Sequence, residues 1–130
     1  MGQNSFEDAS LSEIYTLLKQ YLDGLYDGDV ASFEKVFHPD SHLYSTDGES
    51  ITDLPREAYF DLIRSRESPR ALGLKRHDQI VSVHKAGRDT ALAIVNCAIP
   101  PRYFTDYLTL MRSSSGWQII SKSFHVDYHD

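Results

Sequence analysis

The feature that most constrains the fold is a series of four strand-length segments in the second half of the chain. Short Gly-, Pro- and Ser-rich breaks at 86–89, 100–101 and 113–116 separate these segments. Turns this short join strands that run in opposite directions. We therefore expect an antiparallel meander, one face of which is covered by the rest of the chain. The predicted strands span 75–86, 89–99, 102–112 and 117–127.

The N-terminal part predicts two helices that meet without a linker. A capping box, Ser10-x-x-Glu13, indicates the start of the first helix. Gly28 ends it, and Asp29 caps a second helix that has to end at His38, before Pro39. Apolar residues three and four positions apart give the first helix one buried stripe. The stripe consists of Leu11, Ile14, Tyr15, Leu18, Tyr21, Leu22 and Leu25.

A hairpin and a third helix complete the first half. Weak alternation over 42–46 and the Asp47-Gly48 turn predict the hairpin. The helix is expected over 53–66, with Pro55 in its first turn. It brings three apolar residues to one side: Tyr59, Phe60 and Ile63.

Composition excludes several classes of function. The 130 residues fit one domain, and 13 Lys plus Arg against 19 Asp plus Glu give a net charge of −6. An acidic chain is a poor ligand for nucleic acid or an anionic membrane. No apolar run approaches the roughly 18 residues that span a bilayer, and the polar, acidic N-terminus is unlike a signal peptide. We expect a single cytoplasmic domain over 1–130, with residues 1–9 flexible, that binds neither nucleic acid nor membrane.

The cysteine and histidine residues do not indicate a metal or redox site. Cys97 is the one cysteine, so it cannot form an internal disulfide, and the apolar run around it indicates an inert core position. His125 and His129 would lie about 13 Å apart on a strand, too far to share an ion. We expect no metal and no cofactor.

The last two predicted strands carry the most informative pattern. Side chains alternate between the faces of a strand, and the more apolar set of each should face the helices. This places Asp106 and Lys122 on the inner face as cross-strand neighbours. Burying two charges costs several kcal/mol per ion unless they pair or meet a polar ligand. The two inner sets are Phe104, Asp106, Leu108 and Leu110, and Gln118, Ile120, Lys122, Phe124 and Val126.

Two interpretations of these charges stay open. Asp106 and Lys122 could form a structural ion pair, or be left in solvent if the register differs by one residue. Alternatively, they are polar groups of a pocket that orient the polar end of a bound ligand.

Several segments together resemble a known family. Tyr21 ahead of Gly28-Asp29, followed by residues 37–40 (FHPD) and four long strands, is similar to the nuclear transport factor 2-like superfamily. Residues 37–40, 106–110 (DYLTL) and 117–122 (WQIISK) resemble, more narrowly, the Putative lumazine-binding family.

This resemblance covers about residues 10–125. It implies a cystatin-like α+β cone, in which a curved antiparallel sheet wraps three helices and leaves a pocket at the open end. Many members of the superfamily form homodimers through the outer sheet face. A semi-polar row on the third predicted strand suits such an interface: Tyr103, Thr105, Tyr107, Thr109 and Met111.

The resemblance also bears on catalysis. In ketosteroid isomerase-type members, a first-helix tyrosine donates a hydrogen bond to a developing oxyanion, and Tyr21 matches that position. The base of those enzymes corresponds here to Ser45, and their second acid to Phe104 or Thr105. Ser45 cannot remove a carbon-bound proton unaided, so this isomerase chemistry is not expected. Tyr21 equally suits a core position in an apolar stripe.

Three functions therefore remain candidates. We favour a pocket that binds a small apolar or aromatic molecule with a polar end. The second candidate is a small lyase or isomerase that uses Asp106, Lys122 and Tyr21, for which burial would have to lower the pKa of Lys122 if it acts as a base. The third is a protein-interaction module. The expected pocket residues are Tyr21, Tyr59, Phe60, Phe104, Asp106, Leu108, Lys122 and Phe124.

Overall fold

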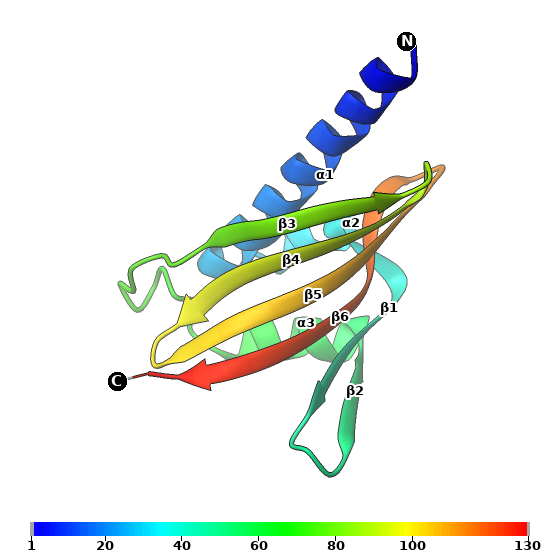
Figure 1. The fold of residues 1–130 in the computed structure, drawn as a ribbon. Helices are drawn as coiled ribbons and strands as arrows, with labels where there is room; N and C mark the ends of the chain where they lie inside the picture. Colours follow the sequence, from blue (N-terminus) through cyan, green and yellow to red (C-terminus); the bar gives the residue numbers. More distant parts are fainter. Residues whose placement is uncertain (1, 130) are drawn as a thin grey trace.

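A computed structural model describes the backbone of residues 2–129 and the side chains of residues 9–129. Three helices lie behind one face of a curved sheet, so the architecture is α+β as expected (Figure 1). None of the described helices is long and apolar enough to cross a membrane. In chain order the elements are α1 (Gly2–Asp27), α2 (Val30–Val36), β1 (Phe37–Thr46), β2 (Ile51–Pro55), α3 (Arg56–Ser65), β3 (Gln79–Ala86), β4 (Thr90–Ile99), β5 (Arg102–Ser113) and β6 (Gly116–Tyr128).

The six strands form one sheet in the order β2-β1-β6-β5-β4-β3. The meander β3–β6 is antiparallel, as predicted, and its strands lie close to the expected ranges. The expectation of a wholly antiparallel sheet is wrong, because β1 and β6 are parallel. No short turn joins these two strands, so the direction in which they pair is not restricted by a connection.

The helix α1 is longer than predicted. It begins at Gly2, and Ser10 lies buried inside it, so the predicted start at the capping box is wrong. Nothing in residues 3–9 breaks a helix, and a capping box is only a local signal. Tyr15 also leaves the predicted stripe, with 46% of its surface exposed, whereas Leu17 is buried. Residue 1 and the side chains of 2–8 lie outside the described residues, and flexibility of residues 1–9 stays a prediction.

The junction of α1 and α2 follows the sequence signals. Gly28 takes the left-handed conformation with φ of 66°. Asp29 caps α2, and its carboxylate accepts a hydrogen bond from the backbone N–H of Ser32. A side chain on Gly24 would place its Cβ 2.5 Å from the ring of Phe33, so the glycine allows the two helices to come close.

The predicted end of α2 at His38 is wrong, because the helix ends at Val36 and Phe37 already belongs to β1. Phe37 pairs with Ile119 of β6, and the register of β1 shifts between Phe37 and His42. Pro39 lies within this irregular segment, where a missing backbone N–H is tolerated.

The hairpin β1–β2 turns at Asp47-Gly48, as predicted. The carboxylate of Asp47 accepts hydrogen bonds from the backbone N–H groups of Glu49 and Ser50. The helix α3 begins at Arg56 rather than at residue 53, because 53–55 pair with β1 as part of β2. Its predicted apolar side is confirmed: Tyr59, Phe60 and Ile63 are buried.

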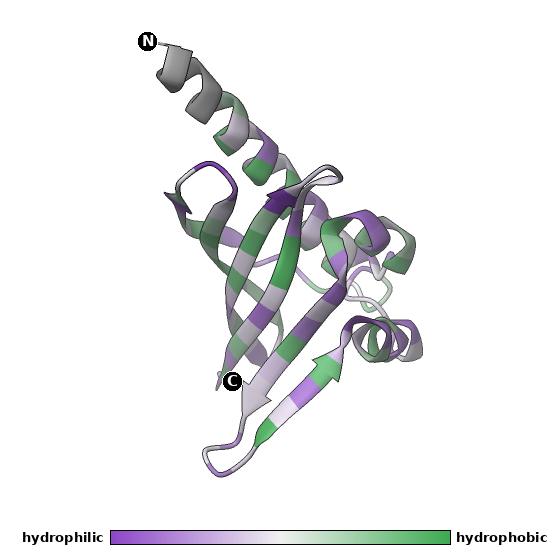
Figure 2. Cartoon of the chain, turned by 90° about the vertical axis from the view of Figure 1, so that its right-hand side faces the viewer, coloured by the Kyte–Doolittle hydropathy of each residue, from purple (hydrophilic) through white to green (hydrophobic). Residues whose placement is uncertain are grey.

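The core lies between the helices and the inner face of the sheet, and hydrophobic and polar residues alternate along the strands (Figure 2). The predicted inner face of β6 is wrong at Gln118 and at Ile120, since Gln118 pairs with the exposed, outward-facing Met111. Leu110 pairs with Ile119 and Thr109 pairs with Ser121, so Ile120 is an extra residue in a β-bulge. Consequently Ile119, not Ile120, is fully buried.

Candidate functional site

Asp106 and Lys122 both lie inside the protein, as predicted. Asp106 is fully buried and Lys122 is 6% exposed, with 3.8 Å between Nζ of Lys122 and Oδ2 of Asp106. They are cross-strand neighbours, as predicted, although not directly opposite each other, since Asp106 faces Phe124 and Lys122 faces Leu108. The bulge adds one residue to β6 and moves the pairing by one position. The two charges are diagonal neighbours on the inner face, where long side chains still meet.

Two tyrosines from the helical layer complete the group. Oη of Tyr21, on α1, donates a 2.6 Å hydrogen bond to Oδ2 of Asp106. Nζ of Lys122 donates a 3.3 Å hydrogen bond to Oη of Tyr59, on α3. We call Tyr21, Tyr59, Asp106 and Lys122 the interior cluster. It links α1 and α3 to β5 and β6 through buried polar atoms.

The ammonium group of Lys122 is surrounded by aromatic rings. Nζ lies 4.9 Å from the ring centre of Tyr59, 5.2 Å from that of Tyr21 and 5.5 Å from that of Phe124. Aromatic faces attract cations at such distances. The rings and Asp106 therefore replace part of the hydration that the buried ammonium has lost.

Burial and charge shift the proton affinities of the cluster. Burial, reinforced by the Asp106 carboxylate, raises the pKa of Tyr21 well above its ordinary value. Burial also raises the pKa of Tyr59, although Lys122 acts in the opposite direction. Burial acts to lower the pKa of Lys122, but Asp106 and Tyr59 outweigh it and the net change is upward. Lys122 therefore stays protonated near neutral pH, and the suggestion that burial makes it a base is wrong.

Sequence reasoning missed the proximity of Cys97 to the cluster. Its Sγ lies 3.9 Å from Oδ2 of Asp106. Burial, followed by the Asp106 carboxylate, raises the pKa of the Cys97 thiol to about 12. The thiol is therefore protonated and a poor nucleophile, in line with the inert position expected. Alternation with the buried Ala93 and Val95 on β4 could have shown that Cys97 faces inward.

The second oxygen of Asp106 is the unusual atom of the site. Oδ1 is buried and has no hydrogen-bond partner among the described residues. An ionised carboxylate can accept several hydrogen bonds. Leaving such an acceptor buried without a donor costs about 1–3 kcal/mol or more. An additional hydrogen-bond donor at Oδ1 would remove this cost.

The remaining predicted pocket residues divide between two places. Phe104 and Phe124 lie beside the cluster, with their ring centres 5.9 Å apart, and Leu108 is buried opposite Lys122. Phe60 lies in the aromatic core, with its ring centre 6.0 Å from that of Phe33.

A pocket of about 460 Å³ lies at the end of the sheet where β4 ends and β5 begins, and the interior cluster does not line it. Its lining residues are His77, Asp78, Gln79, Asn96, Cys97, Tyr103, Phe104, Thr105 and Asp127. Ser45, which the resemblance places where isomerases have their base, pairs with Thr52 in the β1–β2 hairpin.

Comparison with known proteins identifies the family. Residues 9–125 match the family described as Putative lumazine-binding. The chain belongs to this family. It is also 29% identical over 114 residues to the aldolase FrzH of a Cladobotryum species, an alignment that covers 81% of this chain and 82% of FrzH.

Solved structures of similar shape show that this family member has the nuclear transport factor 2-like, cystatin-like fold. An NTF2-like protein from Silicibacter pomeroyi has a TM-score of 0.81 and 19% identity, covering 93% of this chain and 98% of its own. A ketosteroid isomerase-like protein from Erwinia carotovora has a TM-score of 0.71 and 14% identity. The match covers 92% of this chain and 97% of that protein. The expected fold and family are confirmed.

Proposed function

We propose that this protein binds a small organic molecule inside the cone and that a hydrogen-bond donor of that molecule occupies Oδ1 of Asp106. The observation that carries the proposal is the buried Oδ1 without a partner in the described part of the chain. A ligand N–H or O–H would donate a hydrogen bond to this acceptor, while the hydroxyl of Tyr21 continues to donate to Oδ2.

The surroundings of Asp106 suggest the character of the rest of the ligand. Phe104 and Phe124 present aromatic rings next to the cluster, and Leu108 is apolar. Binding sites for small molecules combine such apolar walls with a few fixed polar groups. A flat aromatic body with one donor group suits this lining. The family match supports a ligand-binding interior.

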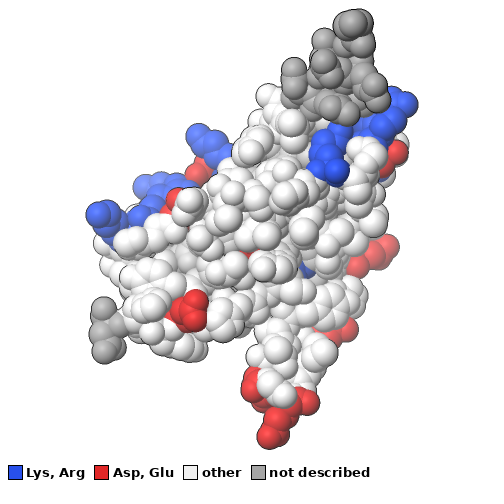
Figure 3. Space-filling model, viewed as in Figure 1, with Lys and Arg blue, Asp and Glu red and all other residues white. Residues whose placement is uncertain are grey.

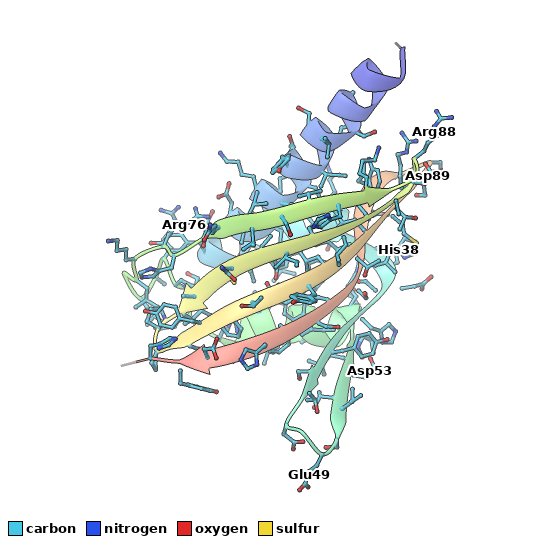
Figure 4. All side chains as sticks on the ribbon, in the orientation of Figure 1. His38, Glu49, Asp53, Arg76, Arg88 and Asp89 are labelled. Atoms are coloured by element: carbon cyan, nitrogen blue, oxygen red, sulfur yellow. The ribbon has the colours of Figure 1, made fainter. Side chains whose placement is uncertain are left out.

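The experiment uses two neutral probes that differ in one donor, N-(p-tolyl)-2-naphthylamine and its N-methylated form. Fluorescence titration measures Kd for the wild type, Asp106→Asn and the control Asp89→Asn. Asp89 lies on the β3–β4 turn, at the end of the molecule marked by Arg88 in Figure 4. We expect N-methylation to weaken binding to the wild type and the control about tenfold, and binding to Asp106→Asn far less. Equal effects of N-methylation on all three proteins would refute the proposal.

A second candidate, favoured by the relationship to the aldolase FrzH, is acid–base chemistry on a β-hydroxyketone. In a retro-aldol step, the Asp106 carboxylate would accept the hydroxyl proton as the carbon–carbon bond breaks. The electron pair of that bond would move to the neighbouring carbonyl and form an enolate. The protonated Lys122 would stabilise its oxygen, and a proton returned to the enolate carbon would complete the cleavage.

A naphthyl β-hydroxyketone that releases a fluorescent aldehyde tests this candidate. We expect turnover by the wild type, a loss of at least about 100-fold in Asp106→Asn, and no covalent adduct on Lys122 after borohydride treatment. Equal turnover by both proteins would contradict a role for Asp106. Trapping of the substrate on Lys122 would replace this mechanism with one through a Schiff base.

A further inference from the structure

Two arginines stand at the end of the molecule where β4 ends and β5 begins. Arg66 directly follows α3, and Arg102 is the first residue of β5. Figure 1 shows the end of α3 and the start of β5 on the side of the molecule where the β4–β5 turn and the C-terminus lie. Both side chains are half-buried.

Arg102 is aligned with the interior cluster along β5. Arg102, Phe104 and Asp106 alternate with outward residues, so they share the inner face of the strand. Cζ of Arg102 lies 5.8 Å from the ring centre of Phe104. A strand rises about 3.3 Å per residue, so the backbone positions of Arg102 and Asp106 are about 13 Å apart. An aromatic wall thus separates a cation from the Asp106 acceptor.

Arg66 approaches the same region from the helical layer. Its charge interacts with Tyr59 and Tyr21 of the cluster, and also with Arg102. Burial lowers the pKa of Arg66, and the like charge of Arg102 contributes in the same direction. The two arginines therefore lie at the same end of the molecule, and their charges act on each other.

These two arginines differ from most others in the protein. Within residues 9–129, no hydrogen bond or ion pair involves the guanidinium of Arg66 or Arg102. A half-buried cation without a counterion is unfavourable, and a second one beside it increases the repulsion. Five other arginines are paired with carboxylates: Arg56, Arg64, Arg70, Arg76 and Arg112.

We propose that Arg66 and Arg102 together bind an anionic group of the ligand, either a carboxylate, a sulfonate or a phosphate. Guanidinium groups bind such oxyanions through paired, charge-assisted hydrogen bonds. The inference rests on the proposed function, because the same ligand places its donor on Asp106. The ligand class is therefore an aromatic anion whose hydrogen-bond donor lies at the opposite end of the ring system from the charge.

A charged and a neutral probe of the same shape test the inference. The charged probe is 6-(p-toluidino)naphthalene-2-sulfonate, whose sulfonate lies across the naphthalene from the N–H. The neutral probe is N-(p-tolyl)-2-naphthylamine. We expect the wild type to bind the sulfonate at least about tenfold more tightly than the amine. Arg66→Met and Arg102→Met should each remove most of this preference, because they weaken binding of the sulfonate far more than binding of the amine.

Controls separate binding from folding. Arg64→Met, on the exposed side of α3, should keep the full preference for the sulfonate. Because Arg66 and Arg102 lack counterions in the described residues, their substitution should leave the thermal midpoint unchanged or raise it. Added salt should weaken binding of the sulfonate and not that of the amine.

The outcomes distinguish the two proposals. If the amine binds in an Asp106-dependent way but the sulfonate binds no more tightly, the anion site is refuted and the proposed function stands. The anion site is also refuted if the arginine variants keep the preference. If neither probe binds, both proposals fail.

Discussion

Tyr21 and Asp106 are joined by a 2.6 Å hydrogen bond between buried atoms, although 85 positions separate them in the sequence. The bond connects the long helix α1 to the inner face of β5. The same oxygen of Asp106 lies 3.8 Å from Nζ of Lys122. The carboxylate of Asp106 therefore holds α1 and β6 against β5 and is also the proposed ligand acceptor. Substitutions here should change both stability and binding, and each variant needs both measurements.

Removing the tyrosine hydroxyl should destabilise the fold. Tyr21→Phe keeps the ring, which packs against Phe33 and Phe37, and deletes the donor to a buried carboxylate. We expect the free energy of unfolding to fall by about 2 kcal/mol. Urea denaturation measures it. Tyr15→Phe, on a side chain that is 46% exposed, is the matched control and should change it by less than about 0.5 kcal/mol. Equal effects would mean that the hydrogen bond does not stabilise the fold.

Separating the buried charges should have a larger effect. Asp106→Asn leaves the Lys122 ammonium without its counterion, and we expect a loss of about 3 kcal/mol. The double variant Asp106→Asn/Lys122→Met should be less destabilised than the sum of the single variants, because it no longer buries an unpaired charge. Additive losses in this double-mutant cycle would show that the two charges do not interact.

Much of this site could be predicted from local patterns. Alternation along residues 103–111 placed Asp106 on the inner face, and the stripe of the first helix placed Tyr21 in the core. Both predictions are confirmed, since they depend on the periods of a strand and a helix. The register expected between β5 and β6 differs by one residue at Asp106, because the bulge at Ile120 has no clear sequence signal.

Long-range contacts explain the other differences. Phe37 belongs to β1 because β6, at the end of the chain, pairs with it, and a local reading extended α2 to His38 instead. Residues 53–55 likewise pair with β1 rather than starting α3. Arg66 and Cys97 come near the cluster only through tertiary packing. Arg102 lies four positions before Asp106 on the same strand, so the alternation of side chains also places it on the inner face. The sequence analysis did not use this signal.

High pH should weaken the fold through the cluster. The pKa values of Tyr21, Tyr59 and Lys122 are all raised above the ordinary 10.0 of tyrosine and 10.5 of lysine. Each group therefore binds its proton more tightly in the folded chain than in the unfolded chain. The stabilisation is complete below about pH 10 and is lost as the pH rises through the folded-state values.

Urea denaturation from about pH 8 to about pH 11 measures this loss. We expect the free energy of unfolding to fall less steeply above about pH 10 in Tyr21→Phe than in the wild type, since one raised pKa is absent. Identical slopes in the two proteins would contradict the assignment of the shift to Tyr21.

We also propose a homodimer through the outer face of the sheet. Charged residues lie mainly around the rim of that face and at the tip of the hairpin, whereas its centre is largely uncharged (Figure 3). Tyr107 and Met111 are exposed there. Light scattering should give twice the mass of the 14.8 kDa chain for the wild type, and the monomer mass for Tyr107→Glu. A monomeric wild type would contradict the proposal. A Tyr107→Glu variant that stays dimeric would show that the dimer does not form through this face.

The most direct test of a ligand at Asp106 is a crystal structure of the protein soaked with N-(p-tolyl)-2-naphthylamine. We predict density for the probe against the rings of Phe104 and Phe124, with its nitrogen within about 3.2 Å of Oδ1 of Asp106. Binding of the probe only outside the cone, with side chains closed around Asp106, would contradict the account.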